Sequence, residues 1–85
     1  MATAEPNLIR RLDHTMIRAA VEAHERYLTG RPGGRRASLS YVDLTNCALQ
    51  NANLAEADLT GARLNGALLT GANLDRAVLY GADLR

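Results

Sequence analysis

Two histidines, His14 and His24, are the residues of this chain best suited to metal chemistry. They stand ten residues apart in a predicted helix, a separation of about 1000° of helical rotation, so their side chains point about 80° away from a common face. No cysteine, aspartate or glutamate completes a zinc-like spacing with them. We therefore expect packing or surface roles for both histidines, and neither a metal nor any other cofactor.

Cys47 is the single thiol of the chain, so it cannot form an internal disulfide, which fits a reducing compartment. A cysteine that acts as a nucleophile needs exposure and a lowered pKa. Cys47 occupies the small-residue position of the repeat described below, where side chains point inward. We expect it to pack rather than to catalyse.

Two further patterns bear on ligand binding. Aspartate and asparagine recur through the second half of the chain, which would suit calcium, but hydrogen bonding at the corners of a coil, along its stack of turns, explains their position better. The run RPGGRR, residues 31–36, lacks the strand, lysine and spacing of a phosphate-binding loop, and we expect a linker there. No catalytic constellation emerges, so we expect a protein that is not an enzyme and takes no small-molecule substrate.

Length and charge set the broad class. Eighty-five residues make one domain, and with no Phe or Trp its core must come from Leu, Ala, Ile and Val. Residues 1–36 carry seven Arg against four acidic residues (7 − 4 = +3), and residues 37–85 carry three Arg against five (3 − 5 = −2). Neither half has the clustered basic charge of a nucleic-acid-binding surface. With no signal-peptide-like or membrane-spanning run, we expect a cytoplasmic protein that binds neither nucleic acid nor membrane.

Residues 7–29 are predicted to be helical, because apolar side chains recur there at steps of three or four residues. The predicted apolar stripe consists of Ile9, Leu12, Met16, Ala20, Ala23 and Tyr27. Asp13 or Thr15 could cap a second start, which leaves open one broken helix or two short ones. Gly30 is placed to be the left-handed residue just past the helix end. Residues 1–30 would form a helical cap and residues 31–36 a linker.

From residue 37 a five-residue unit repeats ten times. Leucine recurs at Leu39, Leu44, Leu49, Leu54, Leu59, Leu64, Leu69, Leu74, Leu79 and Leu84, and a small residue precedes each leucine by two positions. The residue between them is often Asp or Asn, and Gly61, Gly66, Gly71 and Gly81 lie at the junctions. Neither a helix nor a strand has period five. A chain that buries all these leucines must turn a corner after every unit.

The run of A[DN]LxG units from Ala37 to Arg85 resembles the pentapeptide-repeat family. The resemblance implies an all-β solenoid, a right-handed quadrilateral β-helix with four units per turn, and hence about two and a half coils over residues 37–85. The preceding VEAHERYLTGRPGGRRASL resembles a helical preamble found before some bacterial members, which supports an N-terminal α-helical cap.

Four units per turn predict that each residue stacks on the residue twenty positions later, about 4.8 Å away. The leucines then form four inner columns, beginning at Leu39, Leu44, Leu49 and Leu54. The outward positions provide a check of this register. We expect an alternating charge ladder of Asp43, Arg63 and Asp83, a Glu56–Arg76 pair and an Asn53–Asn73 pair.

The two ends of the predicted coil differ. The N-terminal helix can lie over the leucines of the first turn, whereas no such cap is apparent after Leu84, and an open edge invites pairing. Three explanations stay open: a fragment of a longer repeat protein, self-association through the last turn, or docking on a different protein. The outward Leu68, Val78 and Tyr80, with Leu84, are the candidate interface residues.

The leading functional hypothesis is a non-enzymatic protein–protein interaction or assembly module. Its expected partner is another protein or a second copy of the chain, bound through the C-terminal coil. The alternative follows from the resemblance: some family members mimic DNA and bind DNA gyrase, and are associated with quinolone resistance or topoisomerase control. Such mimicry needs a long, strongly negative rod, and a net charge of −2 over about two and a half turns counts against it.

Overall fold

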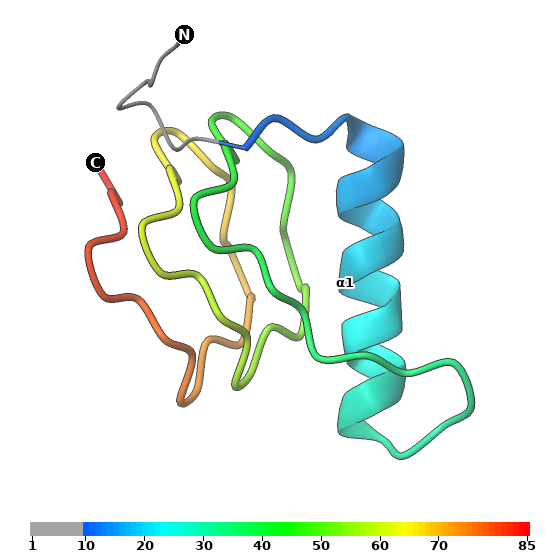
Figure 1. Ribbon diagram of the computed structural model, residues 1–85. Helices are drawn as coiled ribbons and strands as arrows, with labels where there is room; N and C mark the ends of the chain where they lie inside the picture. The colour runs from blue at the N-terminus through cyan, green and yellow to red at the C-terminus, as the bar shows by residue number, and fades with distance from the viewer. Residues whose placement is uncertain (1–9) are drawn as a thin grey trace, which may run out of the picture.

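The computed structural model describes residues 10–85, which form one helix followed by a coiled chain (Figure 1). The helix, α1 (His14–Leu28), lies across one end of the coil, and the last residues lie at the opposite end. Within this described part of the chain, no helix is long and apolar enough to cross a membrane. The architecture is therefore a stack of turns with a helix over its first turn.

Local signals account for both ends of α1. The Asp13 carboxylate accepts a hydrogen bond from the Met16 amide (2.8 Å), which satisfies a free donor of the first helical turn. After Leu28, the amides of Gly30 and Arg31 donate to the carbonyls of Tyr27 and Arg26, and Gly30 adopts φ 70°. The predicted Asp13 cap and left-handed Gly30 are confirmed.

The predicted helical start and stripe need correction. Residues 10–13 are not helical, while residues 7–9, including Ile9, lie outside the described residues. Met16 and Tyr27 are 52% and 42% exposed, whereas Ile17 and His24 are buried. Leu12 and Ala20 of the predicted stripe do pack against the core. Ile17, Val21 and His24 complete the buried face in place of Met16 and Tyr27, so this face of the helix is turned by one position from the predicted stripe.

The linker is held tightly against α1. The Arg35 amide donates to the Ala23 carbonyl (3.0 Å). A Cβ on Gly34 would lie 2.6 Å from the Cα of Tyr27, closer than any real side chain approaches backbone. Glycine at position 34 therefore allows the chain to return across the helix and start the first turn at Ala37.

Parallel bridges confirm the twenty-residue register of the coil. They join Ser38 to Asp58, Asp43 to Arg63, Ala48 to Leu68, Asn53 to Asn73, Asp58 to Val78 and Arg63 to Asp83. Each bridge is a single pair, so regular strands are absent from residues 10–85. We name residues 37–56 the first turn, residues 57–76 the second turn, and residues 77–85 the start of a third.

The chain turns at every unit, as the period of five predicts. From Val42 onward, the amide of each small residue donates to the carbonyl of the leucine three positions earlier, as in Val42 to Leu39 (3.1 Å) and Ala82 to Leu79 (2.9 Å). Four such corners make one turn and give the coil four sides. We number the sides by their units in the first turn: residues 37–41, 42–46, 47–51 and 52–56.

Every corner after a leucine has left-handed backbone. The predicted junction glycines have φ from 65° to 73°. Asn46 and Asn51 adopt φ 61° and 62°, which asparagine tolerates, but Tyr41 and Glu56 do the same (60° and 67°) at a cost of about 1–2 kcal/mol each. The coil imposes this conformation on residues that do not favour it.

Repeated Asp and Asn residues stabilise these corners locally. Asp43 accepts hydrogen bonds from the Thr45 amide (3.0 Å) and hydroxyl (2.6 Å), and Asp58 does the same with Thr60. Asn73 accepts from the amide of Asp75 (2.9 Å). The predicted corner role is confirmed, but the prediction that these bonds run along the stack is wrong, because they reach two residues along the chain rather than the next turn.

The outward charges stack in the predicted register but pair differently. Glu56 and Arg76 form the expected ion pair at 3.3 Å. In the ladder, however, Asp43 pairs with Arg11 (3.4 Å) and Asp83 with Arg85 (2.8 Å), and no described ion pair includes Arg63. The ladder prediction is correct in position and wrong in pairing, because arginines nearer to each carboxylate compete with Arg63.

Candidate interaction surfaces

The covered end of the coil, formed by the first turn, is closed by polar groups on three of its four sides. On the second side, Arg10 pairs in parallel with Val42: its amide donates to Tyr41 O (2.5 Å) and its carbonyl accepts from the Asp43 amide (2.8 Å). On the first side, the Arg10 guanidinium donates to the carbonyls of Ser38 and Ser40. These contacts satisfy an edge that would otherwise be free to pair.

His24 and Glu25 of α1 close the fourth side. The fully buried His24 ring accepts from the Ala37 amide at Nδ1 (2.9 Å) and bonds through Nε2 to Ala55 O (2.6 Å). The Glu25 carboxylate accepts from the Asn53 amide (3.0 Å). The His24 side chain thus joins the start and the end of the first turn, a role that the spacing of the two histidines did not indicate.

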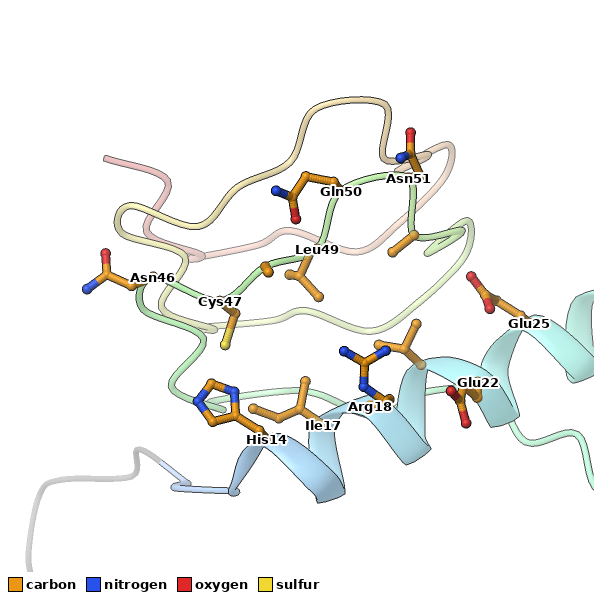
Figure 2. A pocket seen from close by; sticks show the side chains of 13 residues that line it. His14, Ile17, Arg18, Glu22, Glu25, Asn46, Cys47, Leu49, Gln50 and Asn51 are labelled. Carbon is orange, nitrogen blue, oxygen red and sulfur yellow. The ribbon is translucent and has the colours of Figure 1, made fainter.

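The third side of the first turn faces a cavity of about 330 Å³ between the coil and α1. The helix contributes His14, Ile17, Arg18, Val21, Glu22 and Glu25, and the coil contributes the unbroken run of residues 46–52. Figure 2 shows Ile17 and Arg18 pointing from α1 toward this run, with the Cys47 sulfur pointing back toward the helix. We call this feature the side-three groove.

Cys47 forms part of the groove wall without the properties of a nucleophile. It is 7% exposed, and its burial, followed by the nearby charge of Asp43, raises the pKa of its thiol. His14 also borders the groove, while His24 lies in the core, so the two histidines do not meet. Among residues 10–85, no group of three or more His, Cys, Asp or Glu side chains could hold a metal ion.

The opposite end of the coil, which we call the open end (residues 66–85), is less buried. Leu69, Leu74 and Leu79 are only partly buried and Leu84 is 55% exposed, although all four lie in inner columns. In the turn before, the equivalent amides of Leu49, Leu54, Leu59 and Leu64 donate to the next turn. The amides of Leu69, Leu74, Leu79 and Leu84 have no acceptor within residues 10–85.

The four predicted interface residues are all exposed but do not form one patch. Their exposures are 50% for Leu68, 40% for Val78, 83% for Tyr80 and 55% for Leu84. Val78 and Tyr80 share the first side of the coil, Leu68 lies on the third side above Ala48, and Leu84 belongs to an inner column. The structure thus groups Val78 and Tyr80 and separates Leu68 from them.

Comparison with known proteins identifies the repeats. A family model for pentapeptide repeats matches the chain in eight copies, over residues 37–74 and 52–85. The two matches together cover residues 37–85, more than half of the chain. A search among curated proteins found no match.

Proposed function

We propose, on the premise that the chain belongs to the pentapeptide-repeat family, that it is a non-enzymatic interaction or assembly module that self-associates through its open end. The proposal includes the right-handed, four-sided β-helix that the repeats imply, with α1 as its N-terminal cap. It also includes a cytoplasmic location, because the single Cys47 suits a reducing compartment.

The contrast between the two ends of the coil carries this proposal. First-turn leucines are between 0% and 5% exposed under α1, while Leu84, in the same inner column as Leu44 but in the last turn, is 55% exposed. The open end also offers backbone amides that the previous turns use for pairing. Apolar side chains beside unpaired amides favour a partner that supplies both apolar contact and carbonyl acceptors.

A rigid coil suits such a role because its edge is organised before binding. The stacked turns are joined by hydrogen bonds such as Leu59 to Val78 O (2.8 Å) and Leu64 to Asp83 O (2.7 Å). A partner that docks on this edge therefore has less backbone and side-chain freedom to remove than it would on a loop.

The test is the solution mass of the chain, measured by light scattering over a wide concentration range. We expect a dimer or larger species that Leu84→Asp and Tyr80→Arg each convert to monomer, because a charge at the joint would be buried. Met16→Asp, which places the same charge on an exposed helical position, is the matched control and should leave the mass unchanged. A monomer at every concentration would rule out self-association and leave the open end to another protein or to further repeats.

The structure gives no particular support to DNA mimicry. Arg63 lies between Asp43 and Asp83 in the bridge register, which interrupts the negative row that a mimic of the phosphate backbone needs. Supercoiling by DNA gyrase in the presence of excess protein is the direct assay, and we expect no inhibition.

A further inference from the structure

The side-three groove combines an unpaired backbone edge with a charged helical wall. Asp43, Ala48 and Asn53 occupy the same position in successive units, and the amides of Asp43 and Asn53 point toward the covered end, where Arg10 O and Glu25 accept them. The Ala48 amide must point the same way. It has no acceptor within residues 10–85, although the flanking equivalents are both bonded.

The carbonyl groups of this edge are also free of described donors. On the first side Ser38 and Ser40 accept from Arg10, and on the fourth side Ala55 accepts from His24. The equivalent carbonyls of the third side, those of Ala48 and Gln50, receive no hydrogen bond from residues 10–85. With the Asn46 carbonyl, which likewise receives no hydrogen bond from residues 10–85, one donor and three acceptors line the groove, spaced as in the edge of a strand.

The neighbouring side shows which kind of occupant this edge accepts. There, a single extended residue, Arg10, pairs in parallel by donating to Tyr41 O and accepting from the Asp43 amide. One unit later, on the third side, the carbonyl of Asn46 is equivalent to that of Tyr41, and the amide of Ala48 is equivalent to that of Asp43. The side-three groove therefore continues an interface that the chain already forms with an extended segment.

Charge on the helical wall restricts the chemistry of that occupant. The wall carries Arg18 together with two carboxylates, Glu22 and Glu25. Glu25 is already bonded to the Asn53 amide, whereas Arg18 points toward residues 46–52 and belongs to none of the ion pairs between described residues. The floor is apolar, formed by Ile17, Val21 and Leu49. A carboxylate beside Arg18, flanked by small apolar side chains, would match both features.

We propose that the side-three groove binds an extended segment of a partner protein that pairs in parallel with residues 46–50 and presents an aspartate or glutamate to Arg18. This site is separate from the open end and does not depend on self-association. The segment takes the place at the third side that Arg10 takes at the second.

Selection from a display library of random linear heptapeptides on the immobilised chain tests the proposal. We expect enrichment of peptides with one acidic residue between β-branched or small apolar residues. An enriched peptide, synthesised and titrated calorimetrically, should bind Arg18→Glu at least about tenfold more weakly, because a charge-assisted hydrogen bond becomes a repulsion. Arg35→Glu, the same charge change on the exposed linker, should bind normally.

Amide hydrogen exchange locates the peptide independently of any substitution. In the free chain, the Ala48 amide should exchange faster than those of Asp43 and Asn53, and saturating peptide should slow Ala48 at least about tenfold. No enrichment over a bare surface, equal binding by Arg18→Glu, or unchanged exchange at Ala48 would each overturn the proposal. Thermal melting of Arg18→Glu, expected to match the unsubstituted chain, distinguishes lost binding from lost folding.

Discussion

The first turn and the open end are built from the same five-residue unit, yet their burial differs sharply. Leu44 is 0% exposed and Leu84, forty residues later in the same inner column, is 55% exposed. Each leucine follows a corner with the same left-handed backbone, and the parallel bridges place the two leucines in one register. The repeat therefore directs a side chain inward, but burial comes only from what covers the turn.

Covering the first turn requires polar as well as apolar groups. Ile17 adds a buried side chain to the core, while Arg10, His24 and Glu25 bond to the exposed backbone of the turn. An apolar cap alone would leave these amides and carbonyls buried without partners, at about 1–3 kcal/mol for each group. The chain thus shows at one end what a partner would have to supply at the other.

Truncating one leucine at each end gives the largest expected contrast. Leu44→Ala should lower the free energy of unfolding by about 2–5 kcal/mol, because it leaves a cavity in the buried core. Leu84→Ala should cost about 1 kcal/mol or less, because half of that side chain is already exposed. Urea denaturation at a low protein concentration measures both. Equal losses would show that the two ends are equally buried in solution.

Replacing His24 tests whether polar contacts hold the cover in place. His24→Leu keeps much of the side-chain volume but leaves the Ala37 amide and Ala55 carbonyl without their partner, for an expected loss of about 2–4 kcal/mol. His14→Leu, at an exposed position at the start of the same helix, is the control and should change stability little. If His24→Leu were as stable as the control, packing rather than hydrogen bonding would fix the helix. Denaturant titration of both variants decides between these two origins.

The smallest expected effect on stability comes from the aspartates at the corners, and it can be compared between the first turn (Asp43) and the second (Asp58). Hydrogen bonds from Thr45 lower the pKa of Asp43, and those from Thr60 lower the pKa of Asp58, both below the ordinary value of 3.8. The unfolded chain therefore binds protons at higher pH than the folded chain does. Stability from these corners should be complete above pH 3.8 and disappear as the pH falls through the folded pKa values.

Carboxyl chemical shifts followed by NMR against pH test this directly. Thr45→Val should raise the pKa of Asp43 and leave that of Asp58 unchanged, and Thr60→Val should do the reverse. Thr45→Val removes the hydroxyl but keeps the backbone amide, so a titration of Asp43 that it does not move would assign the lowered pKa to that amide and to the charges of Arg11 and Arg63.

The amino-acid sequence by itself determined the coil. Ten leucines at period five predict inner columns and a corner in every unit, and the twenty-residue bridges and the three-residue turn bonds agree. These features are local and repeated. Each of the ten units predicts the same corner, so together they predict the coil more strongly than any single unit does. The helix cap at Asp13 and the left-handed Gly30 are readable for the same reason, because both depend on neighbouring residues.

Only the tertiary structure decided how the helix meets the coil. Two adjacent stripes of α1 have helical period, and the choice of the one with Ile17 and His24 depends on backbone groups of Ala37 and Ala55 that no local pattern indicates. The side-three groove arises in the same way, from residues 14–25 and 46–52 that meet across the docked helix. The repeat determines how the turns stack, because each unit packs against a unit of the same sequence pattern. The first turn has no such unit on its outer side, so its burial depends on contacts with distant parts of the chain.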